Sequence, residues 1–422
     1  MEYNRIMKDG TNLFLGQVGN VVIGLINMMI LTRVLTTEDM GKYSLFLMVV
    51  NLAVQLGLNW SDASVLRHGR EEYVKYGKIN RSFWARFYLF MPLVILCTVG
   101  YLIFYKKITD YIGLPTYVIF FIILNFLMLS TISYMSNVYR SIDDIKRASY
   151  ITVIQKLFYL VGLGLIYLNI LERNIIVAII AINLSFLLAL IVNLIGFDKS
   201  KITPYKFEKA YFRKIWSYSW PQLIGFSGLY VINYVDLYVI KTYMTLRDVG
   251  IYNVAYNGFT LITGAILLIN TLFLPLIVEY KAKKRYDLII KYFKKIPIFS
   301  ALWVLMIICG LFLSNFIITF FFSNKYIESI PSFNVLLIAT IFYFVYVSLM
   351  PFINAFDLIL YNQVFNVIKS VINVILDFIL VPKIGIIGAA YGTTISFFVG
   401  MILTALVVYI KRKTIFKKSK DI

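Results

Sequence analysis

Twelve blocks of mostly apolar residues, each about 20 residues long, follow one another along the whole chain. A helix needs about 20 such residues to cross the hydrocarbon core of a membrane, whereas membrane-spanning strands show alternating segments of about 10 residues. Hydrophobic residues make up 60% of the chain and charged residues only 15%. These features predict an all-α polytopic membrane protein. The predicted spans are residues 12–31, 43–62, 84–105, 117–139, 150–170, 174–196, 216–240, 249–272, 296–321, 333–356, 364–382 and 386–410.

The basic residues are distributed unevenly among the segments between these blocks. If the N-terminus lies in the cytoplasm, the termini and the even-numbered loops hold roughly three times as many Lys and Arg residues as the odd-numbered loops. Short loops rich in Lys and Arg stay on the cytoplasmic side of a membrane. We therefore attribute the net charge of +20 to topology and to contact with membrane lipids. Both termini are predicted to be cytoplasmic, and we expect no nucleic-acid partner.

The two halves of the chain share a motif. Residues 36–43 and 245–252 both fit the pattern T-x-x-D-x-G-x-Y, and each motif lies between the first and second apolar blocks of its half. Lys156 and Lys369 correspond in the same way, and both pairs are separated by about 210 residues. A Thr followed three residues later by Asp is typical of a helix start, because side-chain oxygens can accept from free backbone N–H groups there.

This internal repeat predicts the domain organisation. Each half holds six spans, an even number, so the halves have the same orientation in the membrane and are parallel repeats. We predict two six-helix bundles, residues 1–210 and 211–422, related by an axis along the membrane normal. A substrate pathway between two such bundles, opened to each side in turn, is the expected mechanism.

Ionisable side chains inside apolar blocks are costly and are functional candidates by default. Lys156 and Lys369 lie early in corresponding blocks, where each can face a cavity or extend its ammonium to the inner interface. Asp236 and Asp377 lie in the seventh and eleventh blocks, where each can serve a coupling ion, Na⁺ or H⁺. For Asp236, a hydrogen bond between helices is the alternative interpretation.

Further polar candidates lie at span ends and within the spans. Arg33 and Arg67 follow the first and second blocks, where a guanidinium group can bind a phosphate or simply fix the topology. Amide side chains within the spans can bind a sugar or can hydrogen-bond between helices. The amides selected as pathway candidates are those of Asn20, Asn51, Asn233 and Asn257.

Several kinds of chemistry have no support in the sequence. The single histidine, His68, makes histidine-based metal sites improbable, and Cys97 and Cys309 lie inside apolar blocks. No G-x-x-x-x-G-K-[ST] loop, H-E-x-x-H motif or G-x-S-x-G elbow occurs. We therefore predict no catalytic residues, no metal site and no cofactor, and the chain is expected not to be an enzyme.

Three stretches together resemble the polysaccharide biosynthesis branch of the multidrug/oligosaccharidyl-lipid/polysaccharide (MOP) exporter superfamily. They are TRVLTTEDMGKY at residues 32–43, Asp236 followed by VGIY at residues 249–252, and VPKIGIIGAA at residues 381–390. The number, order and length of the spans also resemble this superfamily over the whole chain. The resemblance implies a MATE-like fold of twelve transmembrane helices.

The resemblance also implies a function. A protein of this branch would move a polyprenyl-pyrophosphate-linked oligosaccharide, the repeat unit of an O-antigen, capsule or exopolysaccharide, to the outer leaflet of a bacterial cytoplasmic membrane. Lys156, Lys369, Arg33 and Arg67 are then the candidates for binding the pyrophosphate. The polymerase and the glycosyltransferases of the same pathway are the protein partners that such a role implies.

Two other functions remain as alternatives. One is an ion-coupled drug exporter of the same superfamily, against which the two deep lysines argue if the drugs are cationic. The other is a membrane-embedded polysaccharide polymerase, which usually carries a large outer loop. The longest predicted outer loops of this chain, such as residues 32–42, are short, so the flippase is the preferred prediction.

Overall fold

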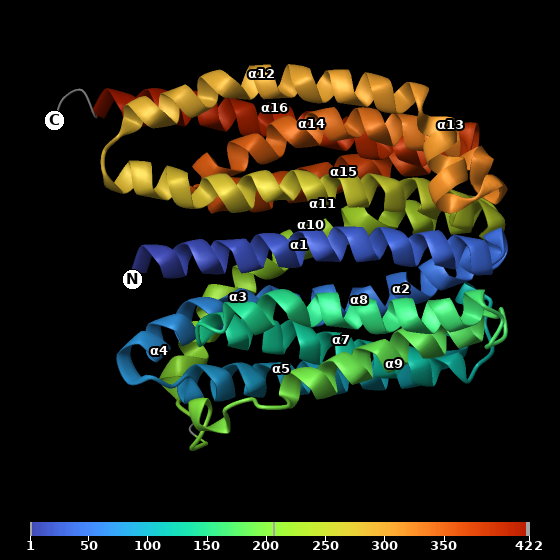
Figure 1. Ribbon diagram of the computed structural model, residues 1–422, viewed down its shortest axis with the longest axis horizontal. Coiled ribbons are helices and arrows are strands. Elements are labelled where there is room, and N and C mark those ends of the chain that lie inside the picture. The colour runs from blue at the N-terminus through green and yellow to red at the C-terminus, as the bar shows by residue number, and fades with distance from the viewer. Residues whose placement is uncertain (1, 206, 419–422) are drawn as a thin grey trace. The chain divides into compact units, whose positions relative to one another are not determined.

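A computed structural model describes residues 2–205 and 207–418 of the chain as helices joined by turns, and that part of the chain contains no strand. Twelve of its helices are long and apolar enough to cross a membrane (Figure 1). The protein is therefore an all-α, multi-pass membrane protein, which confirms the fold class predicted from the apolar blocks.

The chain forms two compact units, Met1–Tyr230 (unit 1) and Val231–Ile422 (unit 2). The boundary lies within α10 (Lys209–Tyr243), between Tyr230 and Val231, whereas the predicted bundles divide between residues 210 and 211. Before α10, unit 1 contains α1 (Glu2–Val34), α2 (Thr37–Gly57), η1 (Asn59–Ser61), α3 (Asp62–Ser64), η2 (Val65–Gly69), α4 (Arg70–Tyr76), α5 (Asn80–Ile103), α6 (Tyr105–Ile112), α7 (Val118–Ser141), α8 (Ile145–Tyr167), α9 (Ile175–Leu194) and η3 (Lys199–Lys201). After α10, unit 2 contains α11 (Leu246–Ala282), α12 (Tyr286–Phe312), α13 (Ser314–Ile317), η4 (Ile318–Phe322), η5 (Asn324–Ser329), α14 (Ile330–Ala355), α15 (Ile359–Ile384) and α16 (Ile386–Lys418).

The same helix contacts recur in the two units. In unit 1, α2 and α5 pack on α7, and α7 and α8 pack on α9. In unit 2, α11 and α12 pack on α14, and α14 and α15 pack on α16. Each contact of the first set has its counterpart in the second set, in the same chain order. The internal repeat that the sequence predicted is therefore present in the packing of the helices.

The repeated motif begins a helix in both units, as predicted. Thr36 precedes α2 and accepts a hydrogen bond from the Asp39 backbone N–H at 3.1 Å. Thr245 precedes α11, where its side chain and that of Asp248 each bond the backbone of the other residue. These bonds satisfy N–H groups that have no partner in the first turn of a helix.

The second predicted span is interrupted rather than continuous over residues 43–62. The helix α2 ends at Gly57, Leu58 leaves the helical conformation with φ of −131°, and the chain continues through the short turns η1, α3 and η2. Ser61 donates its hydroxyl proton to the Leu58 carbonyl at 2.9 Å. Such bonds from Ser, Asn and Asp side chains compete with the helical backbone pattern, which explains the break.

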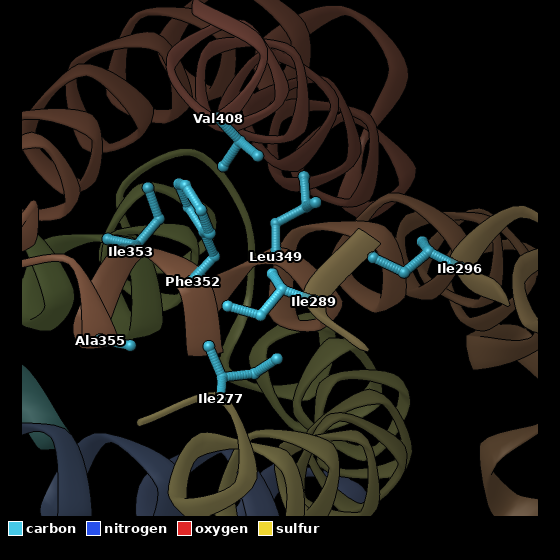
Figure 2. Packing of buried hydrophobic residues seen from close by; sticks show 8 residues of the cluster. All are labelled: Ile277, Ile289, Ile296, Leu349, Phe352, Ile353, Ala355 and Val408. Atoms are coloured by element: carbon cyan, nitrogen blue, oxygen red, sulfur yellow. The ribbon is translucent and has the colours of Figure 1, made fainter. Parts of the chain in front are cut away.

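A cluster of buried apolar side chains holds four helices of unit 2 together (Figure 2). The cluster joins α11, α12, α14 and α16, and it includes Phe352, which is fully buried. Its members are Ile277, Ile289, Ile296, Leu349, Phe352, Ile353, Ala355 and Val408. Apolar packing therefore fills one part of unit 2 and leaves the polar side chains to gather elsewhere in it.

Candidate functional site

Two buried aspartates lie at the centre of a polar cluster in unit 2. Asp236 on α10 accepts hydrogen bonds at Oδ2 from the Tyr252 hydroxyl on α11 and from Thr393 Oγ1 on α16, the latter at 2.9 Å. Asn373 and Asp377, one helical turn apart on α15, complete the set, which we call the carboxyl cluster. Four helices that are separate in the sequence thus contribute to one site.

The two residues from α15 lie against Asp236 and α16. Asn373 Nδ2 lies 3.4 Å from Asp377 Oδ1 and 3.5 Å from Thr393 Oγ1. Thr393 and Asn373 link the carboxyl groups of Asp236 and Asp377 into one polar network, in which the two carboxyl groups interact. Neither aspartate is more than 1% exposed, so both carboxyl groups are removed from water.

Several side-chain oxygens of the carboxyl cluster accept no hydrogen bond within the described part of the chain. Asp236 Oδ1, Asp377 Oδ2 and Asn373 Oδ1 are buried and accept no hydrogen bond from any side chain or backbone that the structure describes. Two like charges about 4 Å apart repel by about 4 kcal/mol at the effective dielectric constant of a protein. The two carboxylates therefore require a positive charge between them, either a proton or a small cation.

Lys369 lies two turns before Asp377 on α15 and is only 3% exposed. Its Nζ lies 4.4 Å from the ring centroid of Tyr346 and 5.3 Å from that of Phe397. We call these two rings the aromatic cage. No acidic side chain pairs with it among the side chains that the structure describes. The Tyr346 hydroxyl donates to Asn362 Oδ1, which fixes one wall of the cage.

Lys156, the counterpart of Lys369 in unit 1, has different surroundings. Its Nζ donates to the backbone oxygen of Asn20 on α1 at 2.7 Å, and the side chain is half-buried. Asn20 Nδ2 donates to Thr152 Oγ1 at 2.8 Å, and Asn27 Nδ2 donates to the backbone oxygen of Lys156 at 3.0 Å. Of the sequence candidates, Lys156 and Asn20 are therefore brought together, on the contact between α1 and α8.

The repeat shows that unit 1 has no second carboxyl cluster in its described part. Tyr43 and Tyr252 are equivalent residues of the repeated motif. Asn27 and Asp236 are separated by the same number of residues, so Asn27 is the counterpart of Asp236 in unit 1. In unit 1 the Tyr43 hydroxyl bonds the Tyr159 hydroxyl at 2.9 Å instead of a carboxylate. An amide thus replaces the first aspartate, and the acidic site is specific to unit 2.

The two arginine candidates lie at different places in unit 1. Arg33 is in the last turn of α1, where its Nη1 donates to the Met29 carbonyl at 2.9 Å. Arg67 lies in η2, is largely exposed, and has its guanidinium 5.0 Å from the ring centroid of Tyr218 and 3.9 Å from Glu71. The structure does not bring either arginine into contact with Lys156.

The remaining amide candidates bond mainly within their own helices. Asn51 Nδ2 donates to Leu47 O at 2.8 Å, and Asn257 Nδ2 donates to Asn253 O at 2.7 Å. Asn233 is the exception, because its Oδ1 accepts from the Tyr256 hydroxyl at 3.1 Å and so joins α10 to α11. Their predicted contact with a sugar remains a prediction.

Sequence reasoning missed one buried ion pair in unit 1. Arg86 on α5 is fully buried and donates from Nη2 to Asp62 Oδ1 at 2.8 Å and to the Leu58 carbonyl at 3.2 Å. Ser133 on α7 donates to Asp62 Oδ2 at 2.7 Å. The sequence did contain an indication of this pair, because Asp62 and Arg86 carry opposite charges and lie at the facing ends of two consecutive apolar blocks.

Sequence reasoning also missed Thr393 and the role of Tyr252 in the carboxyl cluster. Threonines and tyrosines are common in membrane spans, so neither residue type stands out until the helices are packed. The position of Thr393, beside G-x-x-x-G in α16, was the one indication that this face approaches another helix.

Comparison with a family model identifies the family of this chain. Residues 6–281 match the family model for polysaccharide biosynthesis proteins. A stretch of 209 residues, 48% of this chain, is 24% identical to an uncharacterized membrane protein of Methanocaldococcus jannaschii. That stretch covers 40% of the relative, so the match spans less than half of the relative's length.

Solved structures with the same fold cover nearly the whole chain. The lipid II flippase MurJ, in an inward closed conformation, aligns with a TM-score of 0.73 over 96% of this chain and 87% of its own, at 14% identity. An inward-facing multidrug resistance MATE family transporter of the MOP superfamily aligns with a TM-score of 0.71 over 94% and 96%, at 14% identity. A MOP superfamily transporter from Pyrococcus furiosus aligns with a TM-score of 0.68 over 96% and 95%, at 14% identity. At these identities the likeness establishes the fold alone.

Proposed function

Because the chain belongs to the polysaccharide biosynthesis protein family and has the fold of MOP superfamily flippases and transporters, we propose that it is a flippase for a lipid-linked oligosaccharide. The substrate is a polyprenyl-pyrophosphate-linked repeat unit of an O-antigen, capsule or exopolysaccharide. The protein moves it from the cytoplasmic to the outer leaflet of the cytoplasmic membrane by alternating access, with both chain termini in the cytoplasm. The family match over residues 6–281 is the observation that carries this proposal.

The pyrophosphate group requires a cation within the membrane. Lys156 is half-buried and suits this role because, within the described part of the chain, its ammonium donates one hydrogen bond, to the backbone oxygen of Asn20. A Lys ammonium can donate three hydrogen bonds, so donors are left for a pyrophosphate. Asn20 and Thr152 next to it offer further polar groups. We propose Lys156 as the principal pyrophosphate contact, with Arg33 and Arg67 as further candidates on the same unit.

The carboxyl cluster supplies the proposed coupling site. Asp236, Asp377, Asn373 and Thr393 would hold a small cation through side-chain oxygens, three of which accept no other bond. A bound monovalent cation balances one of the two carboxylate charges and reduces their mutual repulsion, so that four helices of unit 2 can remain packed around them. Asp236 and Asp377 bind and release it, and Tyr252 orients Asp236 through its hydroxyl.

Sodium fits the carboxyl cluster better than a proton does. One proton can join the two carboxyl groups, but it leaves the amide oxygen of Asn373 buried without a partner. A hard cation accepts several oxygen ligands at once, including carboxylate and amide oxygens.

Lipid-linked intermediates in cells that lack the gene test the proposed substrate. We expect complete oligosaccharide–lipid units to accumulate in the inner leaflet and the surface polymer to be lost. Normal intermediates with normal polymer would overturn the proposal, and drug sensitivity in the same cells would then favour the exporter. Single units that reach the surface without being polymerised would identify the polymerase instead. The polymerase and glycosyltransferases of the pathway are the proposed partners.

Sodium-dependent stability of the purified protein tests the coupling site. We expect NaCl to raise the melting temperature above that in choline chloride at equal ionic strength, because a ligand that binds only the folded state stabilises it. Asp377→Asn should abolish this rise, whereas Asp110→Asn, on the exposed side of α6, should keep it. If the melting temperature rises when the pH is lowered but not when NaCl is added, the site binds a proton and not sodium.

A further inference from the structure

Lys369 is a buried charge for which the structure makes room. A Cβ atom placed on Gly400 of α16 would lie 2.5 Å from Lys369 Cδ and 3.1 Å from its Cγ. A side chain at position 400 would therefore displace the lysine stem, which occupies the groove left by the glycine. The ammonium is held between Tyr346 and Phe397 and is not extended toward the end of the helix.

The charge of Lys369 is not compensated where it lies. Cation–π contacts in a desolvated site offset only part of the free energy lost when an ion is removed from water, even after the protein relaxes. In the described side chains no carboxylate pairs with it, so the aromatic cage alone does not balance this cost. Uncompensated charges in membrane spans are generally retained for a functional reason.

The negative charges nearest along the same helix are those of the carboxyl cluster. Asp377 lies eight residues after Lys369 on α15, a rise of about 12 Å. Gly392 and Gly400, also eight residues apart on α16, make room for Asp377 and for the lysine stem respectively. The antiparallel contact of α15 and α16 therefore places both charged side chains along one helix interface.

We infer that Lys369 is a positioning residue of the cation site, and that its ammonium, in the protonated form, weakens cation binding by the carboxyl cluster so that the cation can be released. The inference rests on the proposed coupling site. The ammonium repels any cation that binds at Asp236 and Asp377, and because Lys369 and both aspartates are buried, solvent screens this repulsion less than it would at an exposed site. At an effective dielectric constant of about 20, a charge about 12 Å away changes binding about tenfold.

The test measures the Na⁺ dissociation constant of the purified full-length protein by ²²Na⁺ binding, with choline chloride holding the ionic strength constant. Lys369→Met keeps the stem without the charge and should bind Na⁺ about tenfold more tightly than wild type. Lys369→Arg keeps the charge and should stay within about twofold of wild type. Lys383→Gln is the control, because Lys383 is exposed and lies closer to Asp377 along α15 than Lys369 does. Solvent screens its charge, so the Na⁺ dissociation constant should change by no more than about twofold.

Folding of each variant is checked by its melting temperature in Na⁺-free buffer, where loss of an unpaired buried charge should leave Lys369→Met no less stable than wild type. If Lys369→Met fails to fold, Lys369→Gln takes its place. Unchanged or weaker Na⁺ binding in the neutral variant, while Asp377→Asn still abolishes binding, would overturn the role of Lys369 alone. Absence of Na⁺ binding in the wild type would overturn the sodium site, and this inference with it.

Discussion

Gly392 on α16 lies so close to Asp377 on α15 that a Cβ atom at position 392 would overlap the carboxylate oxygen Oδ1. The same atom would lie 3.3 Å from Asn373 Nδ2. The glycine is therefore part of the carboxyl cluster, although it carries no functional group. Close approach of two helices at a glycine is common in membrane proteins, and here it leaves space for an acidic side chain.

Gly392→Ala should displace Asp377 and weaken Na⁺ binding, at a cost in stability of about 1–3 kcal/mol from overpacking. The measurement is the melting temperature with and without NaCl. Gly310→Ala on α12 is the control, because its Cβ atom would meet only Leu337 Cδ1 at 3.8 Å, an ordinary contact. A full sodium response in Gly392→Ala would show that Asp377 does not need this space.

Arg86→Met should strongly destabilise unit 1, because it leaves Asp62 buried without its charge partner. Removal of one member of a buried ion pair costs about 3–5 kcal/mol. Thermal unfolding of the single and double variants checks this. The double variant Arg86→Met with Asp62→Asn should recover part of the loss, since no charge is then left unpaired. Equal losses in Arg86→Met and in the double variant would contradict the pairing.

Thr245→Ala should cost about 1 kcal/mol of stability, because it removes the side-chain cap at the start of α11. The matched control is Thr242→Ala, three residues earlier, where the exposed hydroxyl donates to the Tyr238 carbonyl within α10 and caps no helix start. The difference in melting temperature between the two variants measures the cap. Equal effects would mean that the capping box does not stabilise the helix.

Lys156→Gln should raise the substrate concentration needed for half-maximal flipping about tenfold or more, since a hydrogen bond to a charged group contributes about 1.5–3 kcal/mol. Initial rates in proteoliposomes with a polyprenyl-pyrophosphate-linked oligosaccharide provide the measurement. Lys156→Arg keeps the charge and should retain most of the affinity. If the glutamine variant changed only the maximal rate and not the half-saturating concentration, the pyrophosphate role of Lys156 would be wrong.

The sequence alone determined the membrane class, the twelve spans, the internal repeat and the helix starts at Thr36 and Thr245. These features are local, because hydropathy marks a span and a capping residue marks a helix start without reference to other helices. The break at Leu58 was not predicted, because hydropathy averaged over the block of residues 43–62 hides the polar residues Asn59, Ser61 and Asp62 at its end. The helices also continue beyond their predicted spans, as α10 does, because hydropathy marks only the part expected within lipid.

Only the tertiary structure decided which polar side chains meet. Asp236, Asp377 and Thr393 lie on three different helices, and no spacing in the sequence relates them. Lys156 and Lys369 are equivalent in the repeat, yet one bonds a backbone oxygen and the other lies in an aromatic cage. The physical reason is that a membrane helix is apolar on nearly every side, so the pattern of residues does not reveal its orientation. Packing against neighbouring helices fixes that rotation, and with it the site.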